Sequence, residues 1–154
     1  MDAIQDAYAD DVGHCYGCGR LNPHGHRLKS YWEGGVAVAR FTPEPFHTAI
    51  PGFVYGGLIA SLIDCHATGI AAAAAAEAEG VPVGSLRFVT ARLEIDYLAP
   101  TPIGCALDLL GVPVEVKGRK VVAEVTLAAS GALCARARAV LVRMPETMTP
   151  SARG

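Results

Sequence analysis

The pattern of apolar and polar positions along this chain of 154 residues changes from strand-like to helix-like and back. Two β-rich runs, RLKSYWE and VAVARFTP, flank a Gly-Gly pair at 34–35, which predicts a hairpin. A continuous apolar segment then predicts one helix from Gly56 to about Glu79, where Gly80 stops it. Its alanine block at 71–76 has strong helix propensity.

The second half of the chain has a strand pattern throughout. Leu93, Ile95 and Tyr97 alternate with charged residues, as in a half-buried strand. Three further β-rich runs follow: CALDLLGVPVEV, KVVAEVTLAA and ALCARARAVLVRM. This order predicts an α+β fold in which a curled antiparallel sheet of about five to six strands surrounds one long central helix.

Three segments lie outside the pattern of helix and strands. Residues 1–13 read as a short helical or loose lead-in, and residues 14–28 as a loop rich in Cys, His and Gly. Residues 145–154 read as a disordered tail. We find no internal repeat and no second domain, so we expect a single domain over 1–154.

Composition narrows the function classes. The chain is 51% hydrophobic and only 18% charged, which favours burial against a second copy, as a dimer or tetramer. Its net charge of -2 argues against nucleic-acid binding. The acidic N-terminus lacks the features of a secretory signal, and the long helix carries too many polar residues for a membrane span. Five cysteines without a framework spacing indicate a reducing, cytoplasmic setting.

Asp64 stands out because aspartate is a poor helix former and an unpaired buried charge is costly. Helical spacing places it on a stripe of small and polar residues with Gly57, Ser61 and Thr68. His66 lies about 200° around the helix from Asp64. We therefore expect His66 to be a core histidine that is hydrogen-bonded to the sheet.

The Gly56–Gly57 pair at the helix start is a second candidate for chemistry. The first N–H groups of a helix are unpaired and carry partial positive charge, and glycine lets a ligand oxygen come close. The pair therefore resembles an oxyanion hole. Because eight residues of helix separate Gly56 from Asp64 by about 12 Å, they form one site only if a two-fold dimer brings them together from different chains.

These features, with the segments CYGCGRLNPHG, PGFVYGG, DYLAPTPIG and VKGRK, resemble hotdog-fold acyl-CoA thioesterases of the phenylacetate-degradation (PaaI-like) type. The resemblance covers about residues 14–143. It implies that the amide of Gly56 or Gly57 polarises the thioester carbonyl, while Asp64 of the partner chain attacks it or activates water. It implies no cofactor, since coenzyme A is part of the substrate.

The resemblance also points to residues near the acid. Many members have a hydroxyl there, and both Thr68 and Thr90 match such patterns; the alternatives are a Thr68 hydroxyl bonded within its own helix and plain strand propensity for Thr90. Tyr55 stands where many members have histidine; it can donate a hydrogen bond but is not a base at neutral pH. His47 or Thr48 would have to replace an upstream Asn or Gln.

Coenzyme A carries phosphates, which favour cationic side chains at an exposed rim. The candidates are Arg87, Lys117, Arg119 and Lys120, with Arg136 and Arg138 as weaker ones. The alternative is that these cations are simply solvated.

The loop at 14–28 contains His14, Cys15, Cys18, His24 and His26. Two thiolates and two imidazoles could hold zinc, but a single CxxC is a weak signal. We therefore expect a structural loop and no metal.

The sequence thus predicts a homo-oligomeric acyl-CoA thioesterase. One alternative is a binding module that holds an acyl-CoA or another small ligand without turnover. A hotdog enoyl-CoA hydratase ranks lower, because that chemistry needs an Asp/His pair and only His47 is left to supply the histidine.

Overall fold

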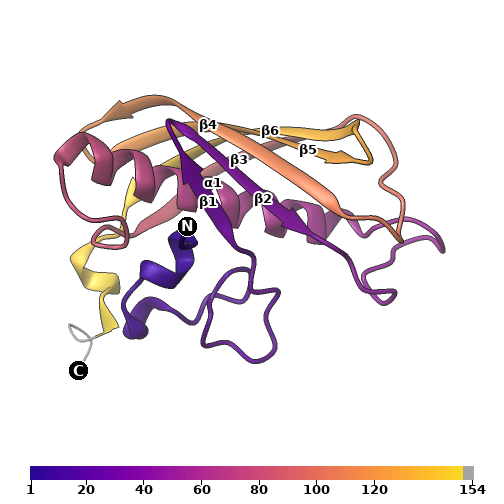
Figure 1. Ribbon diagram of the computed structural model, residues 1–154, viewed down its shortest axis with the longest axis horizontal. Helices are drawn as coiled ribbons and strands as arrows, with labels where there is room; N and C mark the ends of the chain where they lie inside the picture. The colour runs from indigo at the N-terminus through magenta and orange to yellow at the C-terminus, as the bar shows by residue number, and fades with distance from the viewer. Residues whose placement is uncertain (151–154) are drawn as a thin grey trace.

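The computed structural model describes residues 1–150 of the chain. One antiparallel sheet has the strand order β1-β2-β4-β5-β6-β3. Its strands are β1 (Ser30–Glu33), β2 (Val36–Phe41), β3 (Phe88–Tyr97), β4 (Leu107–Lys117), β5 (Lys120–Ala129) and β6 (Ala132–Arg143). A single long helix, α1 (Gly56–Glu79), lies along one face of this sheet (Figure 1). The predicted α+β architecture and the predicted helix are confirmed.

Glycines mark both ends of helix α1: it begins at Gly56, and Gly80 follows its last residue. Tyr55 is extended and caps the first turn, while Gly80 ends the helix in the left-handed conformation, with φ 68°. The alanine block at 71–76 is buried throughout, because small side chains let the sheet close around the helix. By length and composition the helix could cross a membrane, but 83% of its most apolar 18-residue window is buried inside the domain. It is therefore the core helix of this fold.

Among residues 1–150, strand β3 lies at one edge of the sheet and pairs with β6 alone. Its pairing register shifts between Thr90 and Arg92, so Ala91 is the extra residue of a bulge. Thr90 and Tyr97 are seven residues apart, and regular alternation would place them on opposite faces. Because of the bulge, both side chains reach α1, where Thr90 hydrogen-bonds to Asp64 and Tyr97 to Gly56.

The N-terminal segment packs on the helix side of the sheet, as the indigo ribbon of Figure 1 shows. It contains two short 3₁₀ helices, η1 (Ile4–Ala7) and η2 (Asp10–Val12), within the predicted lead-in. Part of the tail that the sequence predicts to be disordered contains a further 3₁₀ helix, η3 (Glu146–Met148), and the rest, 151–154, lies outside the described residues.

Candidate active site

Asp64 is half-buried on α1, where its carboxylate accepts a hydrogen bond from the Thr90 hydroxyl of β3. Of the two threonines that the sequence proposes, the structure brings only Thr90 to the acid. The Thr68 hydroxyl is buried and donates to the backbone carbonyl of Cys65 at 3.0 Å. Thr68 is thus bonded within its own helix and does not contact Asp64 in this chain.

The start of α1 presents free donors beside a hollow. Among residues 1–150, the N–H groups of Gly56 and Gly57 have no hydrogen-bond partner, as expected for a first helical turn. The Tyr97 hydroxyl donates to the Gly56 carbonyl at 2.8 Å. A hollow of about 360 Å³ lies here, and its lining includes Phe53, Gly56, Ile59, Tyr97 and Thr101. This end of the helix can therefore hold a ligand oxygen against the Gly56 amide.

Two tyrosines flank these glycines. The Tyr55 ring lies across Gly57, since a Cβ at that position would be 2.4 Å from the ring. Partial burial, and then the nearby Tyr55, raise the pKa of Tyr97 above its ordinary value. Tyr97 therefore stays protonated at neutral pH and acts only as a hydrogen-bond donor or acceptor. The sequence pattern treats Tyr97 as a strand residue, and only its position in the DYLAPTP segment links it to the site.

His66 is a core histidine, as predicted. It is fully buried, with Nδ1 2.8 Å from the Ser30 hydroxyl and Nε2 3.2 Å from the Ala37 carbonyl. Because a carbonyl only accepts, Nε2 carries the proton that it donates to Ala37, and in the neutral ring Nδ1 accepts from Ser30. Burial lowers the pKa of His66 to about 4.

His47 lies in the irregular segment before α1, away from the acid. Its Nδ1 accepts the backbone N–H of Glu44 at 2.8 Å, and its ring packs against Phe41, Phe46 and His26. The Thr48 hydroxyl bonds to backbone carbonyls of its own loop. Within residues 1–150, Asp64 has no histidine partner, so the geometry gives no support to a hydratase.

The candidate cations for phosphate binding lie in three separate regions of the molecule. Lys117, Arg119 and Lys120 sit at the exposed β4–β5 hairpin, where Lys120 pairs with Glu115. Arg87 instead lies with its guanidinium 4.6 Å above the Tyr8 ring, under the N-terminal segment. Arg87 is therefore covered by the N-terminal segment, unlike a cation at the exposed rim expected to bind phosphates.

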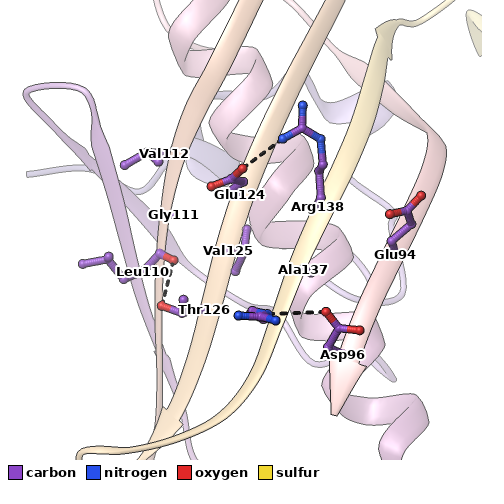
Figure 2. Close-up of a pocket in the computed structure, with 11 residues that line it drawn as sticks. Glu94, Asp96, Leu110, Gly111, Val112, Glu124, Val125, Thr126, Ala137 and Arg138 are labelled. Atoms are coloured by element: carbon purple, nitrogen blue, oxygen red, sulfur yellow. Dashed lines mark hydrogen bonds and ion pairs between the residues drawn. The ribbon is translucent and has the colours of Figure 1, made fainter. Parts of the chain in front are cut away.

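Arg136 and Arg138 lie on the outer face of the sheet, opposite α1. A hollow of about 410 Å³ runs across this face, and Figure 2 shows its charged residues. Arg138 pairs with Glu124, and Arg136 pairs with Asp96. Exposed ion pairs of this kind contribute little to stability. The outer hollow does not include Asp64 or Gly56, so the candidate site with these residues is a separate one on the helix face.

A separate cluster joins the N-terminal loop to the helix. The Sγ atoms of Cys15, Cys18 and Cys65 lie within 4.8 Å of one another. Hydrogen bonds from the Cys18 and Cys65 thiols lower the pKa of Cys15 well below its usual range. Cys65 is missing from the zinc candidates of the sequence, because it lies 50 residues from Cys15 along the chain.

A helix wrapped by a curled sheet, with an acid on the helix and free amides at its start, defines a hotdog-fold thioesterase. Residues 51–135, more than half of the chain, match the family model of the thioesterase superfamily. The chain therefore belongs to that superfamily.

Individual relatives agree with this family. A thioesterase superfamily protein from Shewanella loihica PV-4 is 57% identical, with a TM-score of 0.71 over 92% of this chain and 99% of that one. The PaaI protein of E. coli shares the fold at 19% identity, with a TM-score of 0.60 over 75% and 82% of the two chains. The acyl-coenzyme A thioesterase THEM4 of Xenopus laevis is 38% identical over 84 residues, which are 54% of this chain and 33% of that relative. The match thus spans about a third of the curated relative's length.

Proposed function

We propose that the protein hydrolyses an acyl-CoA thioester to a free acid and coenzyme A, at a site built from two copies of the chain. The observation that carries this proposal is the pair of contacts that β3 makes with α1. Thr90 near one end of the strand holds Asp64, and Tyr97 at the other end holds Gly56. The acid and the free amides are therefore attached to opposite ends of one exposed edge strand.

A second copy that pairs with this edge in antiparallel orientation completes the site. Pairing centred on Glu94 places Thr90 of one strand opposite Tyr97 of the other, because Ala91 and Arg92 of the bulge together oppose Asp96. Asp64 then lies beside the Gly56 amide of the second chain. The edge suits such pairing: it is ten residues long, and the apolar side chains of Leu93 and Ile95 are only partly buried.

The chemistry follows from these positions. The Gly56 N–H, supported by the positive end of α1, stabilises the negative charge that develops on the thioester oxygen. Asp64 of the other chain either attacks the carbonyl carbon or takes a proton from a water molecule that attacks it. The C–S bond then breaks, and the thiolate of coenzyme A leaves and takes up a proton. Where Asp64 itself attacks, water then hydrolyses the acyl–Asp64 anhydride, which releases the free acid and restores the carboxylate. Thr90 holds the carboxylate in place throughout.

A structure with the same fold supports coenzyme A as part of the proposed substrate. The protein smu.793 from Streptococcus mutans shares the fold at 20% identity, with a TM-score of 0.61 over 76% and 88% of the two chains, and is bound to acetyl CoA. For this chain we propose the exposed hairpin cations Lys117, Arg119 and Lys120 as contacts for the phosphates.

A substrate panel tests the proposal. The purified protein is incubated with short, medium, long and aryl acyl-CoA esters, and release of free thiol is followed. We expect turnover of at least one ester, and its loss in Asp64→Asn with dimer formation unchanged by light scattering. Tight binding of acyl-CoA without thiol release would instead support a non-catalytic binding module.

A further inference from the structure

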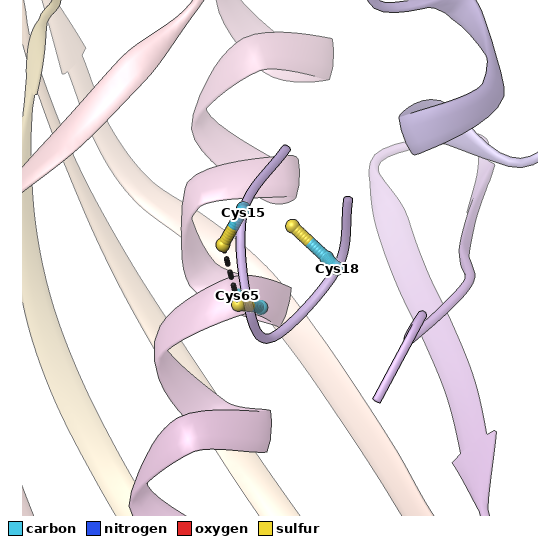
Figure 3. A group of neighbouring side chains, drawn as sticks. All are labelled: Cys15, Cys18 and Cys65. Carbon is cyan, nitrogen blue, oxygen red and sulfur yellow. Dashed lines mark hydrogen bonds between the residues drawn. The ribbon is translucent and has the colours of Figure 1, made fainter. Parts of the chain in front are cut away.

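Three sulfur atoms from two distant parts of the chain meet beside α1. Cys15 and Cys18 lie on the turn CYGC, and Cys65 projects from the helix toward them, as Figure 3 shows. The Cys15 and Cys65 sulfurs are 3.7 Å apart, and all three lie within 4.8 Å of one another. A tetrahedral zinc ion with Zn–S bonds of about 2.3 Å separates its sulfur ligands by about 3.8 Å. The spacing therefore suits one shared metal ion.

The backbone around the sulfurs is built for this close approach. A Cβ at Gly17 would lie 2.2 Å from the Cys65 sulfur, so any side chain there would push the turn off the helix. A Cβ at Gly19 would lie 2.4 Å from the Cys15 nitrogen, and the Gly19 N–H closes the turn on the Cys15 carbonyl at 2.7 Å. The backbone N–H groups of Leu28 and Gly19 thus hydrogen-bond to the carbonyls of Gly17 and Cys15, which fixes the turn.

The surroundings contain a donor without an acceptor. Tyr8 is 4% exposed, and its hydroxyl is buried with no hydrogen-bond partner among the described residues. Tyr8 belongs to the same buried cluster as Cys18 and Cys65, and Cys15 packs against that cluster. A buried unpaired hydroxyl is costly, and a metal-bound thiolate or water would give it an acceptor.

The charge of the surroundings also fits. One Zn²⁺ with three thiolates carries a net charge of about -1. Arg87 lies 4.6 Å above the Tyr8 ring and lines a hollow together with Cys15. A cation therefore balances the cluster from the side of the N-terminal segment.

We propose that Cys15, Cys18 and Cys65 bind one Zn²⁺ ion, with water in the fourth position, and that this ion fastens the 14–28 loop to helix α1. Soft thiolate ligands favour zinc over magnesium or calcium. Binding displaces the three thiol protons and involves no oxidation. His24 and His26, which the sequence analysis considered as ligands, are not in the cluster; His26 packs against Tyr16, Phe41 and His47. The proposed site differs from the sequence expectation of a structural loop without metal.

Metal content of the whole protein tests the site. The protein is purified with a phosphine reductant, dialysed against metal-free buffer and analysed by mass spectrometry for metals. We expect about one zinc per chain, lost in Cys15→Ser and Cys65→Ser. The matched control is Cys134→Ser, because Cys134 is also a buried free cysteine but lies outside the cluster. The control should keep its zinc.

A second measurement uses the unmodified protein and so does not depend on the variants folding. X-ray absorption of the zinc-loaded chain should show three sulfur neighbours at about 2.3 Å. Removal of the metal should lower the melting temperature of the wild type and of Cys134→Ser, but not of Cys65→Ser.

Three results would overturn the proposal. The first is a metal-free protein in which all five thiols react with a thiol reagent. The second is a metal-free Cys15–Cys65 disulfide in protein purified without reductant, which would make the cluster a redox pair. The third is zinc that persists in Cys65→Ser, which would place the metal elsewhere.

Discussion

At the scale of single residues, the contact between Thr90 and Asp64 is the feature most directly tied to the proposed chemistry. A hydrogen bond to a charged group contributes about 1.5–3 kcal/mol. We expect Thr90→Ala to lower kcat about 10- to 100-fold with a smaller effect on KM, since the hydroxyl positions the carboxylate and does not bind substrate. Steady-state kinetics of Thr90→Ala beside Thr90→Ser checks this, and the serine variant should recover most of the rate.

His66 predicts how stability depends on pH. An unfolded histidine takes up a proton near pH 6.5, whereas the pKa of His66 in the folded protein is about 4. Between these values the unfolded state binds more protons, so the free energy of unfolding decreases as the pH falls from about 6.5 to about 4. The loss should reach roughly 3 kcal/mol.

Urea unfolding at several pH values measures this loss. His66→Gln should be less stable at neutral pH but should show a shallower pH dependence over this range. An unchanged slope in the variant would assign the acid sensitivity to other groups.

At the scale of elements, the first turn of α1 allows one backbone donor to be removed cleanly. Gly56 is the first helical residue, where proline is tolerated, and Tyr55 before it already has the extended conformation (φ -61°, ψ 129°) that a following proline requires. Gly56→Pro deletes the N–H group and should lower kcat by about 10²–10³-fold.

The matched control for this change is Gly56→Ala. A Cβ at Gly56 would meet the Tyr97 ring at 3.5 Å, which is an ordinary contact, so the alanine variant keeps both the donor and the fold. Similar rates for the proline and alanine variants would exclude the Gly56 amide as the oxyanion donor and leave Gly57.

Elements were predictable where a single local signal decides them. The ends of α1 follow from Gly56 and Gly80, and the strand runs follow from alternation and turns. The bulge at Ala91 was not predictable, because nothing in the alternation of Leu93, Ile95 and Tyr97 shows that Thr90 joins the same face. The cysteine cluster was missed for a related reason: its third member comes from the helix, and only tertiary packing brings it to the loop.

At the scale of the whole molecule, the proposal requires that each active site draws residues from two chains. Asp64→Ala and Gly56→Pro should each be nearly inactive alone. When the two are co-expressed and assort randomly, half of the dimers are mixed, and each mixed dimer has one intact site. We expect about one quarter of the wild-type activity to return.

Co-purification with two different affinity tags isolates the mixed dimers for assay. Mixed dimers that stay inactive would show that Asp64 and the glycine amides act within one chain or not at all. Mixing the separately purified variants after dimer formation is the control, since slow subunit exchange should restore little activity.

The sheet order has a consequence for how the chain is made. Within the described part of the chain, strand β3 pairs only with β6, from Phe88 opposite Arg143 to Tyr97 opposite Ala135. During synthesis, β3 therefore leaves the ribosome with both edges unpaired until almost the whole chain has been translated. Unpaired strands of this length invite pairing with other chains. We infer that nascent chains stalled before β6 are the form of this protein most exposed to aggregation, and that the last dozen structured residues of the sheet protect the first strand after the helix.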